Sequence, residues 1–256
     1  MYIDSHVHLF HRRFRDLDAV LSRAEQCGVE AFLCPAIDFA SNLSYTERYD
    51  NVYFAAGLHP RCVGDGAHDE LWEREMEAFA ARPRVRAIGE TGLDYASPAL
   101  TDAQRERQRA WFRRLIELSC RTELPLILHL RGDGAYREAA ELLRGYALPR
   151  PPVVHCFSET LEAARPFLDM GCYFGIGGLA TFSETAIFDA IGALPPERLV
   201  LETDAPWLLP NGCPGKRNEP AYLGTICECA ARRLGMPAER LAAVTAENAR
   251  RLYRIE

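Results

Sequence analysis

The segment Pro125-Leu126-Ile127-Leu128-His129 decides how this chain is expected to fold. It is a short apolar run of the length of one buried strand, and it ends in a polar side chain. Similar runs recur along the chain, and together they predict eight strands, at residues 2–7, 30–35, 52–58, 86–90, 126–129, 153–155, 172–176 and 199–202. Amphipathic stretches lie between or after them and predict helices at 17–27, 69–81, 102–121, 135–144, 160–170, 184–193, 220–234 and 238–251.

Strands that alternate with helices in this way indicate a parallel sheet covered by helices. Eight such units in 256 residues favour an α/β fold, a single (β/α)8 TIM barrel with extra C-terminal helices. The alternative is an open, doubly wound sheet. If that sheet bound a dinucleotide, a glycine-rich turn would follow the first strand, and none does. We therefore predict one barrel domain over residues 1–256.

Charge and composition narrow the class of protein. Thirty basic against 36 acidic residues give a net charge of −6, which argues against a protein that holds nucleic acid by a basic surface alone. The net charge does not exclude an enzyme that binds phosphates through metal cations. The chain has no apolar run of about 18 residues and no signal-peptide pattern, so we expect no membrane partner. Its nine cysteines include no C-x-x-C pair and indicate reduced thiols of a cytoplasmic protein.

Six titratable side chains lie at or just after the ends of the predicted strands: His6, His8, Glu90, His129, His155 and Asp204. Barrel enzymes assemble their active sites at these strand ends, and imidazoles with carboxylates suit a divalent metal ion. Each residue alone has an ordinary structural explanation, such as a hydrogen-bonded histidine or a helix-capping carboxylate. Four of the seven histidines at such positions would be costly to bury without a shared partner, so we favour a metal site.

The segments around these positions resemble the TatD family of metal-dependent deoxyribonucleases, which are amidohydrolase-like barrels. The resemblance covers residues 3–253 and rests on motifs that are weak alone but specific in this order and spacing. They are Asp4-Ser5-His6-Val7-His8-Leu9, Gly57-Leu58-His59-Pro60, Gly89-Glu90-Thr91-Gly92-Leu93-Asp94-Tyr95, Gln108 with Phe112, Leu124-Pro125 with His129 and Arg131, His155-Cys156-Phe157-Ser158, Glu202-Thr203-Asp204-Ala205-Pro206, and Arg217-Asn218-Glu219-Pro220.

The resemblance implies two divalent metal ions, Mg²⁺, Mn²⁺ or Zn²⁺, whose identity the sequence leaves open. It implies that His6, His8 and Asp204 hold one ion and that His129 and His155 hold the other. Glu90 would bridge the two ions, and Asp204 would also accept the proton of the attacking water. A pair of ions about 3.5–4 Å apart can polarise a phosphodiester and stabilise its leaving oxygen. Asp204 and Glu90 are therefore the expected catalytic residues.

The resemblance also implies a 3′-5′ exonuclease acting on single-stranded DNA, and we expect a monomer. Four further residues are candidates for substrate binding: His59, Asp94, Arg131 and Arg217. His59 could equally be a structural, helix-capping histidine, and Asp94 could form an Asx turn. Arg131 could clamp a phosphate through its fork of N–H donors. Arg217 lies in a proline- and glycine-rich loop, residues 205–220, where a solvated charge is the ordinary alternative.

The chain departs from the family pattern at the rim of the predicted site. The departures are residues 9–15, residues 130–134 and Glu159. We therefore keep two other hypotheses: a hydrolase of a small ester, amide or aminoacyl-nucleotide, and a non-catalytic barrel that serves as a binding subunit. We expect His11 to be a surface histidine and Trp207 to pack in the core, although Trp207 could instead stack on a base.

Overall fold

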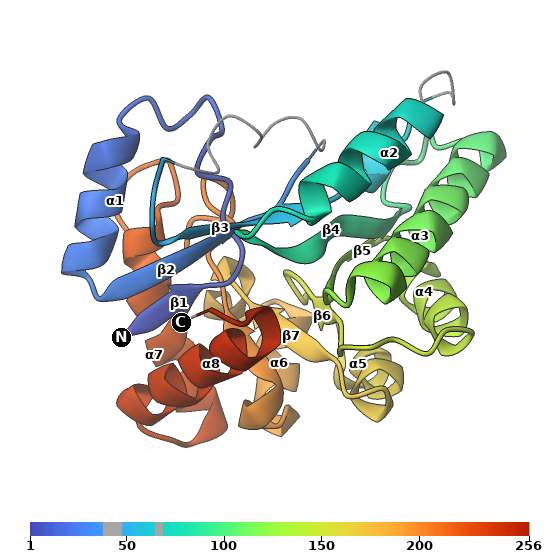
Figure 1. Ribbon diagram of the computed structural model, residues 1–256. Helices are drawn as coiled ribbons and strands as arrows, with labels where there is room; N and C mark the ends of the chain where they lie inside the picture. Colours follow the sequence, from blue (N-terminus) through green and yellow to red (C-terminus); the bar gives the residue numbers. More distant parts are fainter. Residues whose placement is uncertain (38–47, 65–68, 256) are drawn as a thin grey trace.

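The computed structural model describes residues 1–37, 48–64 and 69–255, and it confirms the predicted TIM barrel (Figure 1). All eight strands are parallel and follow one another around the sheet in chain order. They are β1 (Tyr2–Asp4), β2 (Val29–Cys34), β3 (Val52–Ala56), β4 (Val85–Asp94), β5 (Leu126–Arg131), β6 (Val153–Val154), β7 (Tyr173–Ile176) and β8 (Leu199–Leu201). Beyond β1, the Ser5 amide donates to the Leu201 carbonyl of β8 at 3.0 Å, which brings the sheet close to closure.

The helices lie outside the sheet because each has one apolar face. They are α1 (Leu17–Gln26), α2 (Asp69–Ala80), α3 (Asp102–Thr122), α4 (Ala135–Arg144), α5 (Leu161–Asp169), α6 (Ala186–Ala190), α7 (Leu223–Leu234) and α8 (Ala238–Tyr253). In α4, for example, Ala135, Ala139 and Leu143 recur every four residues, and all three are buried. The predicted start of α3 is confirmed, since Thr101 and Gln104 form a reciprocal capping box.

The inside of the barrel is apolar at the end where the strands begin. Ile3, Leu33, Ile127 and Val200 pack there with the last two turns of α8. Two hydrogen bonds hold α8 at this end, because the Asn248 side chain donates to the carbonyls of Pro196 at 2.9 Å and of Leu199, the first residue of β8, at 2.8 Å. One end of the barrel is thus filled, and the carboxyl ends of the strands are left for polar side chains.

Most predicted strands end within two residues of the observed ones, but the first and the fourth are wrong by three or more residues at the carboxyl end. The first strand ends at Asp4, so His6 and His8 do not share the face of a strand. Residues 5–8 instead form separate hydrogen bonds to β2 and to the loop after β8. The Val7 amide donates to the Leu33 carbonyl at 3.0 Å, and the His8 amide donates to the Ala205 carbonyl at 2.8 Å.

The fourth strand does not end at Glu90 but continues to Asp94. Its pairing with β5 shifts register between Ile88 and Thr91, so Glu90 lies in a β-bulge. A bulge redirects a side chain, and here it aims the Glu90 carboxylate into the barrel. The close approach of β5 also requires glycine at position 92, where a Cβ would lie 2.3 Å from the His129 carbonyl oxygen. Among the described residues, no helix is both long enough and apolar enough to cross a membrane.

Candidate metal centre

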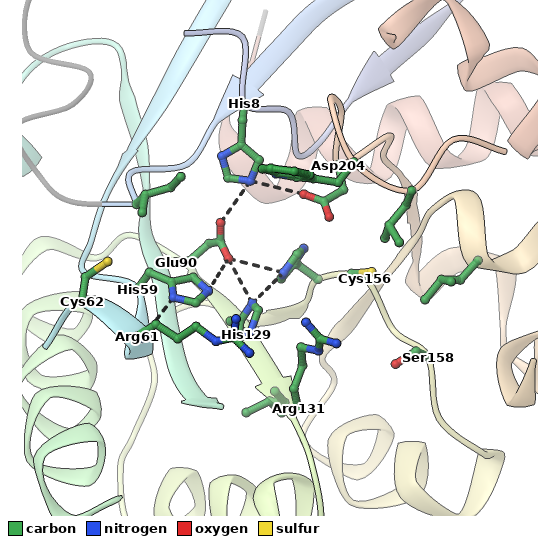
Figure 2. A pocket seen from close by; sticks show the side chains of 16 residues that line it. His8, His59, Arg61, Cys62, Glu90, His129, Arg131, Cys156, Ser158 and Asp204 are labelled. Carbon is green, nitrogen blue, oxygen red and sulfur yellow. Dashed lines mark hydrogen bonds and ion pairs between the residues drawn. The ribbon is translucent and has the colours of Figure 1, made fainter. Parts of the chain in front are cut away.

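A cavity of about 590 Å³ opens at the carboxyl ends of the strands. Its walls include five of the six predicted ligands, and the sixth, His6, is fully buried behind His8 and Glu90. Figure 2 shows Glu90 in the middle of the site, with His8 and Asp204 on one side and His129 on the other. The structure therefore brings together all six residues that the sequence predicts as metal ligands.

The first group of donors gathers around one oxygen of Glu90. Its Oε1 lies 3.2 Å from His6 Nε2 and 3.3 Å from His8 Nε2. Asp204 Oδ1 completes the group, at 3.2 Å from His8 Nε2 and 3.8 Å from His6 Nε2. Ligands at about 2.0–2.2 Å from a tetrahedral ion lie roughly 3.3–3.6 Å from one another. The four donors are thus spaced as ligands of one ion would be.

The second group gathers around the other oxygen of the same carboxylate. Glu90 Oε2 lies 3.1 Å from His129 Nδ1 and 3.5 Å from His155 Nε2, and these two nitrogens are 3.2 Å apart. His59 Nε2 lies farther away, at 3.7 Å from the same oxygen. The Glu90 carboxylate therefore faces one donor group with each oxygen, which is the arrangement of a bridging ligand.

These residues fit divalent cations that accept imidazole nitrogen and carboxylate oxygen. Two subsets, His6 with His8 and Glu90, and His59 with Glu90 and His129, each place their ligand atoms within 4.8 Å of one another. Buried charges of this kind are stable only when they are paired or when they bind a metal. The donor set is therefore chemically matched to a cation such as Zn²⁺ or Mn²⁺.

Burial and neighbouring charges shift the pKa values of these residues in opposite directions. Burial alone would raise the pKa of Glu90, but the neighbouring charges of His6 and His155 hold it well below its usual range. Burial likewise opposes protonation of His155, yet the carboxylates of Glu90, Glu202 and Asp204 together outweigh it and raise the pKa of His155 to about 9. The pKa of His8 is also raised, because its hydrogen bond to Asp204 and the charges of Glu90 and Asp204 together outweigh burial. The carboxylates that raise these two pKa values are the groups that a bound cation would face.

Asp4 anchors the loop that carries the first two histidines. It is fully buried at the end of β1, and burial raises its pKa to about 8. Its carboxylate accepts hydrogen bonds from the amide and hydroxyl of Thr203, at 2.9 Å and 2.6 Å. Because Thr203 directly precedes Asp204, these bonds fix the loops after β1 and β8 relative to each other.

Glu202 supports the second group. Its Oε1 lies 3.5 Å from His155 Nδ1 and also accepts a hydrogen bond from the Cys156 amide. The carboxylate lies directly against Gly175 of β7, where a Cβ would come within 2.1 Å of Glu202 Oε2. A carboxylate behind a ligating imidazole sets the orientation and tautomer of the ring. The position that we expected to end the eighth strand therefore orients His155.

The structure shows the helix-capping alternative for His59, and the other side of its ring faces the cavity. Its Nδ1 accepts from the Arg61 amide at 3.1 Å and caps the short 3-10 helix η2 (Pro60–Cys62). Its Nε2 points toward Glu90 in the cavity (Figure 2). Burial lowers the pKa of His59 to about 4, so the ring is neutral near pH 7.

Asp94 is buried beside the second donor group, and its Oδ2 lies 3.3 Å from His129 Nε2. Its carboxylate also accepts from the Ala96 amide at 3.2 Å, the Asx-type contact that we named as the alternative. The same Oδ2 pairs with Arg61 Nε at 2.7 Å. We did not select Arg61 from the sequence, although it directly follows the motif that contains His59 and Pro60.

The two arginines expected to bind substrate lie in different surroundings. Arg131 is exposed and lines the cavity. Arg217 does not line it: its guanidinium pairs with Asp16 at 2.8 Å and also with Glu219. The expectation that Trp207 packs in the core is wrong, because Trp207 is 38% exposed and forms part of the cavity wall.

Comparison with known proteins agrees with this site. The family model described as TatD related DNase matches residues 3–254. A Bacillus subtilis protein named uncharacterized metal-dependent hydrolase YabD is 34% identical, with 100% of both chains covered. The 3′-5′ ssDNA/RNA exonuclease TatD of Edwardsiella piscicida is 35% identical, with 99% of both chains covered.

The fold comparison points the same way. The crystal structure of YjjV, a TatD homologue from Escherichia coli, superposes with a TM-score of 0.90 at 33% identity, covering 100% of this chain and 98% of that one. Family model, relatives and solved structure all extend over essentially the whole chain. The chain therefore belongs to the TatD family of metal-dependent hydrolases.

Proposed function

We propose that the chain is a nuclease that uses two divalent cations to remove nucleotides from the 3′ end of single-stranded DNA. The observation that carries this proposal is the Glu90 carboxylate, whose two oxygens face two separate donor groups. A single structural ion would need only one such group. Two ions side by side suit the in-line displacement of a phosphodiester, where both the attacking and the leaving oxygen carry charge.

Each cation would have its own set of ligands in this proposal. His6, His8 and Asp204 would hold one, His129 and His155 the other, and Glu90 both. When bound, the cations would lower the pKa of a water molecule and withdraw charge from the phosphate. The remaining requirements are a proton acceptor and groups that position the substrate.

In this proposal Asp204 would accept the proton of the attacking water. Burial would raise its pKa, but the hydrogen bond from His8 and the charges of nearby histidines lower it. The carboxylate is therefore ionised near neutral pH, as a general base must be. It also lines the cavity, so a water molecule next to the substrate can reach it.

The wall beside the second donor group carries the cationic side chains that would hold the phosphate. Arg131 is exposed and projects toward the cavity from the end of β5 (Figure 2). Arg61 also lines the cavity, and its pairing with Asp94 fixes its position. A guanidinium can donate two parallel hydrogen bonds to a phosphate. The neutral His59 would add a further donor from the same wall.

The names of relatives favour a nucleic acid over a small molecule. The relatives from Edwardsiella piscicida and Erwinia tasmaniensis are both called 3′-5′ ssDNA/RNA exonuclease TatD. One feature of the cavity favours the second candidate, a small ester or amide. Leu130, Leu179 and Leu208 line it beside the polar groups, as in pockets that bind small apolar ligands.

A digestion experiment tests the proposal. Single-stranded DNA labelled at either its 5′ or its 3′ end would be incubated with Mg²⁺, Mn²⁺ or Zn²⁺, or with EDTA. We expect metal-dependent shortening, with 5′-labelled strands forming a ladder and 3′-labelled strands releasing a labelled mononucleotide. The double variant His129→Ala/His155→Ala should abolish both. DNA that survives with every metal, while the protein still binds ions, would reject the nuclease and favour small esters.

A further inference from the structure

Trp207 stands at the mouth of the cavity, where two side chains from another loop contact its ring. The guanidinium carbon of Arg13 lies 4.4 Å from the centroid of the Trp207 ring. The His11 ring meets the indole edge-on, with centroids 5.0 Å apart and an interplanar angle of 61°. His11, Arg13 and Trp207 are called the rim platform below. It is an aromatic surface with a cation on it, directly beside the metal ligands.

The rim platform is held in place by contacts between the loops after β1 and β8. Arg217 donates to the Arg13 carbonyl at 2.6 Å and pairs with Asp16, and its guanidinium lies over the buried ring of Phe14. At the other side, the Trp207 amide donates to the Asp204 carbonyl at 3.0 Å. The backbone of Trp207 is therefore held next to Asp204.

The segment that carries the rim platform is locally basic in an acidic protein. Arg12, Arg13 and Arg15 are all exposed. Within residues 1–37, 48–64 and 69–255, none of the three forms an ion pair with a carboxylate, whereas Asp16 is already paired with Arg217 and Arg23. With a net charge of −6 for the whole chain, this segment is a place where a polyanion gains attraction instead of repulsion.

We infer that the rim platform binds the nucleotide on the 5′ side of the bond that is cut, with a base stacked on Trp207 and a phosphate on Arg13. This inference rests on the proposed exonuclease function. If the 3′-terminal nucleotide occupies the cavity, the rest of the strand must leave across the mouth, where the rim platform lies. Stacking accepts any base, because every base has a π face. A base inside a duplex is already stacked, so the rim platform selects single strands.

Arg217 then has a role other than the direct contact that we expected from the sequence. It touches the backbone of Arg13 and fixes Asp16, but it does not line the cavity. It is a positioning residue for the rim platform. This role explains why a basic residue is needed in a loop that follows the metal ligand Asp204 by thirteen positions, 204 to 217.

The test compares two substrates of different length. The value of kcat/KM is measured for a long oligothymidylate and for the methyl ester of thymidine 5′-phosphate, which has no nucleotide on the 5′ side of the bond that is cut, and the ratio of the two values is the readout. Arg13→Glu and Trp207→Leu should each lower the ratio by about tenfold, since stacking of one base contributes about 1–3 kcal/mol. Trp207→Phe keeps an aromatic face and should recover most of the ratio. Arg232→Glu, the same charge change at an exposed position in the last turn of α7, should leave it unchanged.

The outcomes separate this inference from the proposed function. A ratio that stays the same in Arg13→Glu and Trp207→Leu overturns the rim platform even if the enzyme is a nuclease. If the wild type cuts neither substrate, the proposed function fails, and fluorescence anisotropy of labelled oligothymidylate with the metal-free protein decides the inference. Binding that weakens about tenfold in Arg13→Glu but not in Arg232→Glu supports it. Absent or equal binding overturns it.

Discussion

The two ends of the barrel are built from the same strands but contain opposite chemistry. Along β5, Ile127 points into the apolar interior next to α8, and His129, two residues further on, points into the cavity. The same change occurs from Val153 to His155 between β6 and the loop that follows it. Side chains two apart in a strand share a face. The inward face therefore changes from apolar to polar within two residues along the chain.

Because the two ends differ in this way, we expect one end to stabilise the fold and the other to carry the function. The apolar end buries Leu33, Leu252 and Tyr253, a favourable contribution at any pH and without a ligand. The polar end buries imidazoles and carboxylates whose desolvation is unfavourable until a cation binds them. We expect substitutions at the apolar end to change the free energy of unfolding and substitutions at the polar end to change metal binding and activity.

The largest effect is expected at the polar end. Glu90→Gln removes the carboxylate that serves both donor groups, so kcat/KM should fall at least about a thousandfold, because loss of a single transition-state contact already costs about 10²–10³. Initial rates on single-stranded DNA and bound metal per protein would be measured together. Glu228→Gln, on the exposed face of α7, is the matched control. Full activity of Glu90→Gln would mean that the polar end does not catalyse the reaction.

At the apolar end we expect the opposite result, a loss of stability with little change in activity. Leu252 is 2% exposed on α8, so Leu252→Ala should lower the free energy of unfolding by about 2–5 kcal/mol, measured by urea denaturation. Its kcat/KM at a temperature where it is folded should stay near that of the wild type. Leu71→Ala is the control, since Leu71 is 42% exposed. A large loss of activity in folded Leu252→Ala would show that the two ends are coupled.

A smaller effect on metal binding is expected at Glu202, which contacts the candidate ligand His155. Glu202→Gln keeps an acceptor for the Cys156 amide but removes the charge behind His155. Metal affinity should fall by about 10–100-fold, the usual range for such supporting carboxylates. Isothermal titration with Mn²⁺ would measure it, and an unchanged dissociation constant would show that His155 does not bind a cation.

The smallest effect is expected from pH. The pKa of His155 is raised to about 9 in the metal-free cluster, so the ring holds a proton below that pH and must lose it when a cation binds. Apparent affinity for Mn²⁺ should therefore rise by up to about tenfold from pH 8 upward, for the one proton that His155 loses, and should level off above pH 9. Titrations in buffers of different ionisation enthalpy would count the protons. The destabilisation by Leu252→Ala should not follow this curve, because no titrating group is removed.

The sequence by itself determined the repeating units of the barrel and indicated six side chains as candidate metal ligands. Short apolar runs separated by amphipathic ones are local patterns, and local patterns are visible in a chain. The parallel arrangement follows from their alternation, and it brings the ends of all the strands to one face. His129 and His155 could thus be placed together without any coordinates.

The tertiary structure decided what depends on contacts between distant segments. The bulge at Glu90 arises where β4 meets β5, and the loop of His6 and His8 is held by residues that follow β8. Arg61 enters the cavity because Asp94 pairs with it, whereas Arg217 is held by Asp16 and Glu219 away from the cavity. Which carboxylate an arginine pairs with depends on the distance between the two side chains in the folded protein. Neither the spacing nor the periodicity of residues along the chain gives that distance.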